Sequence, residues 1–241
     1  MAVLSQERRG AVGLVTLERP DKRNALSVEL REELRAAFEA LATDEQVACV
    51  VLTGRGSAFC SGMDTTQFGG DRDHRRRLVE TSTGAFHAVG RCPKPVVCAV
   101  SGPALAGGFA LALLCDVRVA DPTASFGFPE LPLGIAPSYA SLRAVVTPAV
   151  ARELCLSGRV VGAGEALRLG IVSEVSAEGG SLERALEVGT GIAAQPRAAV
   201  LETKRRILLD AEQAIGPLVA DEEESFRRAL LGGAGEGGEE G

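Results

Sequence analysis

The sequence predicts an α/β fold, and three observations carry this prediction. Two continuous apolar runs, residues 47–53 and 96–101, have the length and composition of strands that are buried on both faces. Segments with helical spacing alternate with such strands as far as residue 120. The 241-residue chain is 46% hydrophobic and 24% charged, which supplies enough apolar side chains for a sizeable core.

The first elements follow from local patterns. Alternating apolar residues predict a strand over residues 12–18, and the next six residues have the composition of a turn. Ser27 is expected to cap a helix. Helices over 75–89 and 108–114 and a strand over 117–120 complete the alternation. The apolar face of the first helix repeats every three or four residues and consists of Leu30, Leu34, Ala37, Phe38 and Leu41.

The last third of the sequence is predicted to be mainly helical. We expect helices over 148–156, 163–169, 181–194, 196–209 and 215–231, with one short strand over 171–175. The predicted organisation is an α/β core over 1–180, a helical region over 181–231 and a tail over 232–241. The tail holds six Gly, three Glu and one Ala, a composition that predicts disorder because it buries too little apolar surface.

Composition and charge exclude several classes of protein. The net charge is −6 and aromatic residues make up 4%, which argues against nucleic acid as a partner. The longest apolar stretch, 95–114, is interrupted by Gly and Pro, so we expect a soluble, cytoplasmic protein that does not bind membranes. Six cysteines without a C-x-x-C pair and only two histidines predict reduced, packed thiols and no metal site.

Common nucleotide and hydrolase motifs are absent from the sequence. The turn at Gly54 and Gly56 has Phe59 where a dinucleotide fingerprint needs its third glycine, and neither a P-loop nor G-x-S-x-G occurs. Two glycine turns remain, over 59–64 and 101–108. Each follows a predicted strand. Their free N–H groups could converge as an oxyanion hole, or the glycines could simply allow tight packing of helix on strand.

Five blocks together resemble the enoyl-CoA hydratase/isomerase (crotonase) family in order and spacing. They are residues 18–26, 58–64, 94–96 running into 107–108, 115–116 and 126–130, and the likeness spans roughly residues 3–230. The resemblance implies a crotonase-like spiral of ββα units that forms two roughly perpendicular sheets. It also implies a C-terminal helical trimerisation region, a homotrimer or a dimer of trimers, and an acyl-CoA or enoyl-CoA thioester as substrate.

The same resemblance assigns site residues by position. The backbone amides of Met63 and Gly107 would stabilise an enolate oxygen, a role in which one lost donor typically costs about 3 to 4 kcal/mol. Ser61 would lie against the adenine through its backbone, and Lys22 or Arg23 could meet the CoA phosphates. No metal or redox cofactor is required. The remaining positions expected to contact substrate or CoA are Gly62, Asp64, Gly108, Ala110, Pro137 and Ser138.

Two positions bear on the reaction. Hydratases of this family usually use two glutamates, one three residues after the oxyanion glycine and the other twenty residues later; counted from Gly107, these positions are Ala110 and Glu130. We expect burial to raise the pKa of Glu130, as suits a proton shuttle. A single glutamate favours a double-bond isomerase. The alternatives are a 2-enoyl-CoA hydratase and a catalytically inactive acyl-CoA-binding protein.

Ser138 and Tyr139 place two hydroxyl groups near the expected acyl pocket. They could bind a polar group of the substrate, or they could simply satisfy local backbone groups.

Overall fold

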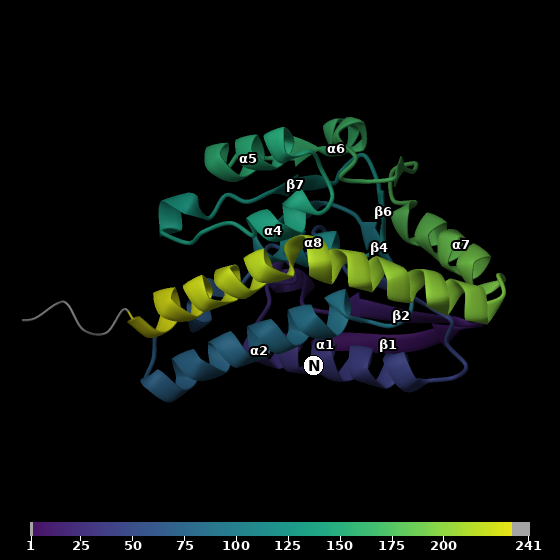
Figure 1. Cartoon of the computed structure of the whole chain (residues 1–241), viewed down its shortest axis with the longest axis horizontal. Coiled ribbons are helices and arrows are strands. Elements are labelled where there is room, and N and C mark those ends of the chain that lie inside the picture. Colours follow the sequence, from purple (N-terminus) through teal and green to yellow (C-terminus); the bar gives the residue numbers. More distant parts are fainter. Residues whose placement is uncertain (1, 233–241) are drawn as a thin grey trace, which may run out of the picture.

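The computed structural model describes residues 2–232, which form two β-sheets surrounded by helices (Figure 1). The larger sheet has six strands in the order β1-β2-β3-β4-β6-β9. Only β1 and β2 are antiparallel, and every other neighbouring pair is parallel. The strands are β1 (Leu4–Arg9), β2 (Val12–Leu17), β3 (Cys49–Gly54), β4 (Val96–Val100), β6 (Val117–Ala120) and β9 (Glu174–Val175).

Helices cover both faces of this sheet. On one face lies the main core, to which α1 (Val28–Thr43), α2 (Arg72–Gly90) and α3 (Gly107–Leu113) contribute. On the other face, α7 (Ser181–Ala193) packs on a smaller apolar cluster. Alternate residues of β3 and β4 point into the two clusters, which explains why both strands are continuous apolar runs. The predicted α/β class is confirmed.

The smaller sheet has the order β5-β7-β8, with β5 (Pro103–Leu105) parallel to β7 (Ser125–Gly127) and β8 (Val161–Gly162) antiparallel to β7. Three short 3-10 helices lie in connections that border the site described below: η1 (Pro20–Lys22), η2 (Thr65–Gln67) and η3 (Leu131–Leu133). Between residues 139 and 169 the chain forms three further helices, α4 (Tyr139–Arg143), α5 (Pro148–Ser157) and α6 (Ala163–Leu169).

The first predicted helix is confirmed in detail. The side-chain oxygen of Ser27 accepts a hydrogen bond from the amide of Leu30 at 3.2 Å, so Ser27 caps α1 as expected. All five residues of its predicted apolar face are buried.

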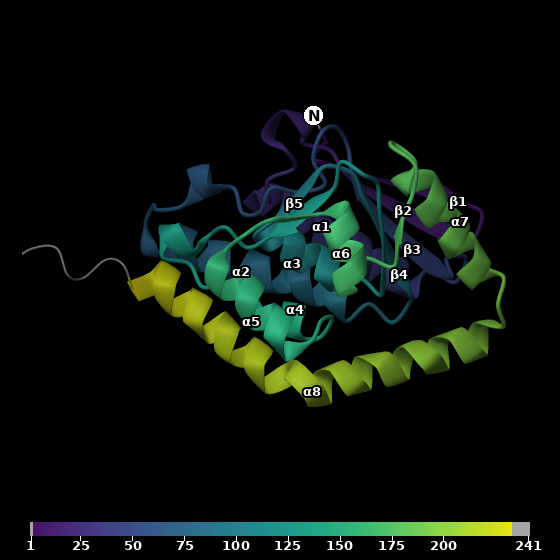
Figure 2. The same cartoon turned by 90° about the horizontal axis from the view of Figure 1, so that it is seen from above.

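The prediction of two separate C-terminal helices was wrong. A single helix, α8 (Arg197–Gly232), runs through both segments with Pro217 inside it. Figure 2 shows that α8 bends near its middle, and proline is the usual cause because it lacks an N–H and its ring crowds the preceding turn. The intervening residues 210–214 are mostly good helix formers, so the helix continues.

Several short or exposed elements were not predicted. Strand β1 is an edge strand with an exposed, mostly polar sequence, and the strands of the smaller sheet are only two or three residues long. The strand expected over 171–175 is reduced to β9. Gly232, expected to begin a disordered tail, is the last residue of α8, and residues 233–241 lie outside the described part.

The helices between residues 2 and 232 include none that is long and apolar enough to cross a membrane.

Candidate active site

The first glycine turn, residues 59–64, is held on both sides by main-chain hydrogen bonds. On one side Cys60 forms a bridge with Ala104, and the amide of Cys60 donates to the carbonyl of Pro103 at 3.1 Å. On the other side the amide of Leu26 donates to the carbonyl of Gly62 at 2.8 Å. The turn is therefore fixed between two segments that are distant in the sequence.

The second turn enters α3 through a strained residue. Ala106 has φ +50° and ψ −125°, a conformation that residues with a side chain rarely adopt, and its amide donates to the carbonyl of Gly127 at 2.9 Å. Such strain costs on the order of 1 to 3 kcal/mol and is found mostly at functional sites. The next residue, Gly107, is the first residue of α3, so its N–H has no acceptor within the helix.

The two turns bring Met63 and Gly107 together. A Cβ atom placed on Gly107 would lie 3.6 Å from Cγ of Met63, and one placed on Gly62 would lie 3.4 Å from the amide nitrogen of Gly107. Among residues 2–232, neither the Met63 nor the Gly107 amide donates to a main-chain carbonyl. Both predicted oxyanion donors thus lie side by side with their amides uncommitted to main-chain bonds.

Glu130 follows β7 and is buried, with 8% of its surface exposed. Its Oε2 atom is buried and has no hydrogen-bond partner among the described residues. Burial raises the pKa of Glu130 from 4.5 to about 7, in the direction expected from its apolar flanks. An aromatic contact ties its segment to α3, because the ring centroids of Phe109 and Phe128 are 4.8 Å apart.

Position 110 is the fourth residue of α3, and the Ala110 side chain there is buried. This helix therefore offers a methyl group at the position where hydratases of the family that the sequence resembles usually have a glutamate.

Lys22 and Arg23 lie in and directly after η1, and both are exposed. Arg23 has φ +48° and its carbonyl accepts a hydrogen bond from the amide of Ser61 at 3.0 Å. The neighbouring Asn24 is fully buried and donates to the carbonyls of Arg55 and Ala58. These bonds hold the two exposed cations next to the first glycine turn.

The carboxylate of Asp64 is occupied within the protein. It forms an ion pair of 2.9 Å with Arg19 and accepts a hydrogen bond of 2.6 Å from the Thr66 hydroxyl. Burial opposes ionisation of Asp64, but these hydrogen bonds outweigh it and lower its pKa. The expected contact of Asp64 with substrate or CoA remains a prediction, and the observed contacts are those of a residue that fixes the loop.

Ser138 and Pro137 lie in the half-buried segment before α4. The Ser138 hydroxyl contacts Oγ of Ser141 at 2.8 Å and Oε2 of Glu222 at 3.1 Å, and Glu222 also accepts a hydrogen bond from the amide of Ala140 at 2.7 Å. Within the described residues, the Ser138 hydroxyl thus contacts side chains of the protein and not the local backbone groups expected, and its contact with a polar group of the substrate stays a prediction.

Arg31 is a residue of this region that the sequence interpretation missed. It is on α1, 1% exposed, and its Nη1 atom lies 3.9 Å from the Met63 sulfur and 2.9 Å from the Leu78 carbonyl oxygen. A signal was present in the sequence, because position 31 lies three residues before Leu34 and seven before Phe38, on the buried stripe of the helix.

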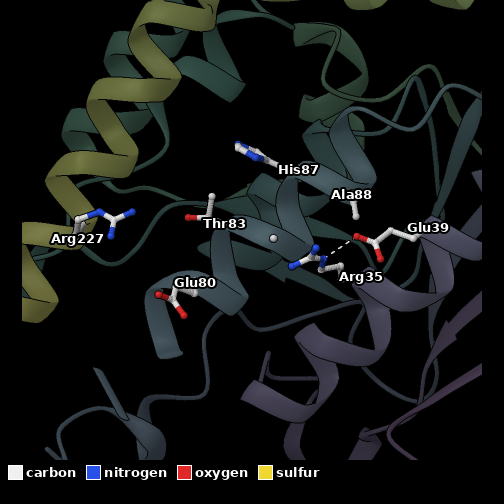
Figure 3. A pocket seen from close by; sticks show the side chains of 8 residues that line it. Arg35, Glu39, Glu80, Thr83, His87, Ala88 and Arg227 are labelled. Atoms are coloured by element: carbon white, nitrogen blue, oxygen red, sulfur yellow. Dashed lines mark hydrogen bonds and ion pairs between the residues drawn. The ribbon is translucent and has the colours of Figure 1, made fainter. Parts of the chain in front are cut away.

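A hollow of about 470 Å³ lies elsewhere, between α1, α2 and α8 (Figure 3). None of the sequence-predicted site residues lines it. Its side chains are mostly charged and of both signs, and Arg35 is paired with Glu39 at 2.7 Å. Charges of both signs, already paired in part, do not define a ligand class, so the two glycine turns and Glu130 remain the candidate active site.

Comparisons with known proteins identify relatives over most of the chain. A family model described as "Enoyl-CoA hydratase/isomerase" matches residues 7–227. The chain is 39% identical over 204 residues to a "Probable enoyl-CoA hydratase" of Rhizobium meliloti, covering 83% of this chain and 79% of that protein. It is 34% identical over 229 residues to the 2,3-dehydroadipyl-CoA hydratase of Escherichia coli, covering 94% and 89%.

A solved structure has the same fold. The crystal structure of an enoyl-CoA hydratase/isomerase from Xanthobacter autotrophicus Py2 superposes with a TM-score of 0.85 at 35% identity, covering 98% of this chain and 88% of that one. The chain therefore belongs to the enoyl-CoA hydratase/isomerase family and has its crotonase-like fold. This confirms the resemblance on which the site was predicted.

Proposed function

We propose that this enzyme is an enoyl-CoA double-bond isomerase in which Glu130 is the sole acid–base residue. The observation that carries the proposal is the contrast between positions 110 and 130: Ala110 is a buried methyl group, whereas Glu130 is buried with an Oε2 atom that has no partner among residues 2–232. A base with a pKa of about 7 can both take and return a proton near neutral pH.

In the proposed reaction the carboxylate of Glu130 removes a proton from C2 of a 3-enoyl-CoA. The electron pair moves onto the thioester oxygen and gives a dienolate, which the amides of Met63 and Gly107 stabilise by hydrogen bonding. The protonated Glu130 then delivers the same proton to C4, and the double bond finishes between C2 and C3. Atoms and charge balance without a metal ion or a redox cofactor.

The CoA moiety would lie over the first glycine turn. Lys22 and Arg23 are exposed beside this turn and can attract the phosphates of CoA, and the Ser61 backbone would meet the adenine. The acyl group would enter between the turn and the segment holding Pro137 and Ser138. The remaining expected contacts are with Gly62, Asp64, Gly108 and Ala110.

A 2-enoyl-CoA hydratase is the second candidate, and the names of the relatives favour it. Hydration needs a group that orients water in addition to Glu130. Glu222 is another carboxylate, near the segment that holds Ser138. It already accepts hydrogen bonds from Ala140 and Ser138, so it is a poor candidate for orienting water. A non-catalytic acyl-CoA-binding protein is the third candidate. The buried Glu130 argues against it.

Product analysis distinguishes these functions. The purified protein is given a 2-enoyl-CoA and a 3-enoyl-CoA in parallel, and the products are separated by chromatography and identified by mass. An isomerase converts the 3-enoyl-CoA to the 2-enoyl-CoA and forms no 3-hydroxyacyl-CoA. Formation of 3-hydroxyacyl-CoA by the wild type would favour the hydratase, and binding without turnover would favour the third candidate. Hydration that appears only in Ala110→Glu supports the isomerase.

We also propose that the protein assembles as a homotrimer or a dimer of trimers through its C-terminal helices. Exposed apolar side chains along α8, namely Ile207, Leu209 and Leu218, support an interface there. Light scattering during size-exclusion chromatography tests this proposal, and a monomer at micromolar concentration would contradict it.

A further inference from the structure

Arg31 is a cation buried without a carboxylate of its own. Its side chain donates from Nε to the carbonyl of Ser27 at 3.2 Å and from Nη1 to the carbonyl of Leu78 at 2.9 Å. No ion pair of Arg31 is found within residues 2–232. The nearest carboxylates are committed elsewhere, because Asp64 is paired with Arg19 and the exposed Glu32 is paired with Arg77.

This arrangement is energetically unfavourable by itself. Removing a guanidinium from water without a counter-ion is costly, and two carbonyl groups compensate it only in part. Burial accordingly lowers the pKa of Arg31, but only to about 10, so the group stays charged at neutral pH. The positive charge is therefore a permanent feature of the protein interior.

The charge lies against Met63. Nη1 of Arg31 and Oγ of Ser82 each lie 3.9 Å from the Met63 sulfur, so the thioether is held between α1 and α2. Methionine has three rotatable side-chain bonds, and these two contacts restrict them. Phe86, one turn after Ser82, approaches the site as well, since a Cβ on Gly107 would lie 3.6 Å from its ring. The cation thus contacts the side chain of Met63, the residue whose amide is one of the two proposed to hold the enolate.

We infer that Arg31 is a positioning residue for the reaction: it fixes Met63 and supplies positive potential behind the oxyanion, so that negative charge on the thioester oxygen is stabilised at a distance. The inference rests on the proposed function, in which the Met63 amide is a donor to that oxygen. A fixed charge in a region of low dielectric acts over several ångströms without touching the substrate.

The experiment measures polarisation of the thioester directly. The CoA thioester of 4-dimethylaminocinnamic acid absorbs at longer wavelength as electron density is drawn onto its carbonyl oxygen. Its spectrum is recorded free and bound to the wild type, Arg31→Met, Arg31→Gln and Arg31→Lys. Arg35→Met is the matched control, because Arg35 lies one turn further along α1, is exposed and, among residues 2–232, pairs only with Glu39.

We expect a clear red shift with the wild type and with Arg35→Met, and most of it with Arg31→Lys. Arg31→Met and Arg31→Gln should give a smaller shift and a kcat lower by about 10- to 100-fold with KM changed much less, since the lost interaction is mainly with the transition state. Equal shifts in Arg31→Lys and Arg31→Gln would overturn the inference. If Arg31→Met does not fold, the comparison of Arg31→Lys with Arg31→Gln is sufficient to test the inference.

The spectrum separates this inference from the proposed function. A red shift that depends on Arg31, in a protein that does not isomerise any 3-enoyl-CoA, would refute the isomerase and keep the inference. Isomerase activity together with the wild-type red shift in every Arg31 variant would support the isomerase and refute the role of Arg31.

Discussion

A Cβ atom on Gly108 would lie 2.1 Å from the carbonyl oxygen of Cys60. The first turn of α3 therefore rests directly on the backbone of the other glycine turn, with no side chain between them. Gly107 differs, since a Cβ there would meet its neighbours at an ordinary 3.6 Å. Close packing thus explains the glycine at 108, and the spacing of the two loops depends on it.

Gly108→Ala should lower both stability and activity. Relief of the clash must move α3 away from Cys60, and overpacking of this kind costs about 1 to 3 kcal/mol. The measurements are the midpoint of urea unfolding and kcat with a 3-enoyl-CoA. Gly191→Ala is the control, because Gly191 lies in α7 and a Cβ there meets nothing within 4 Å. It should raise the unfolding free energy by up to about 1 kcal/mol. Equal stability in both variants would contradict the close contact.

The rate should depend on the ionisation of Glu130. The proposed base acts as the carboxylate, and burial raises its pKa to about 7. We therefore expect kcat/KM to fall tenfold for each pH unit below about 7 and to level off above it. Initial rates across pH 5 to 9, with stability checked at each end, test this. A flat profile down to about pH 5, near the ordinary pKa of a glutamate, would exclude a buried base.

Glu130→Gln should be inactive and, above neutral pH, more stable than the wild type. Loss of the sole proton carrier should lower kcat by at least about 100-fold. Because the pKa of Glu130 is higher in the folded state, the native protein loses stability as pH rises from about 4.5 to 7, and glutamine is free of this cost. The gain should be about 1 to 3 kcal/mol at pH 8 and close to zero at pH 4. A variant that retained full turnover would refute the assignment of the base.

Removal of Glu222 should loosen the acyl side of the site. Glu222→Ala leaves the Ala140 amide without its carboxylate partner and the Ser138 hydroxyl with Ser141 alone, and an unsatisfied amide costs about 1 to 3 kcal/mol. We expect a higher KM for the thioester with a smaller change in kcat. The control is Glu224→Ala on the same helix, because that side chain is exposed and its one ion pair within the described part of the chain is with Arg227. A KM that rises equally in both variants would contradict a local role.

Local patterns in the sequence were sufficient for much of the fold. The buried strands and the capped first helix depend on neighbours within a few residues, and both were predicted. Strand β1 was not, because an exposed edge strand needs no apolar alternation. The continuity of α8 was missed because Gly216 and Pro217 resemble a break, whereas an exposed helix can accommodate a proline by bending.

At the site, the sequence predicted the turns but not what holds them. Glu130 could be predicted to be buried because its immediate flanks are apolar. The pairs Arg19–Asp64, Arg31–Met63 and Glu222–Ser138 join residues 45, 32 and 84 positions apart, so tertiary packing alone decides them. The division of the chain into a core over 1–180 and a helical region over 181–231 stays a prediction.

The bend in α8 has a consequence for local unfolding. The part before Pro217 is anchored by the buried ion pair of Lys204 with Asp116 at 2.7 Å, whereas the part after it carries Glu222 and Glu223, which bind Ala140 and His87. A proline interrupts helical cooperativity, so the second part can open while the first stays folded. Amide hydrogen exchange in α4 should then follow that of the last turns of α8. Access to the acyl side of the site would be controlled from a helix end that touches none of the reacting groups.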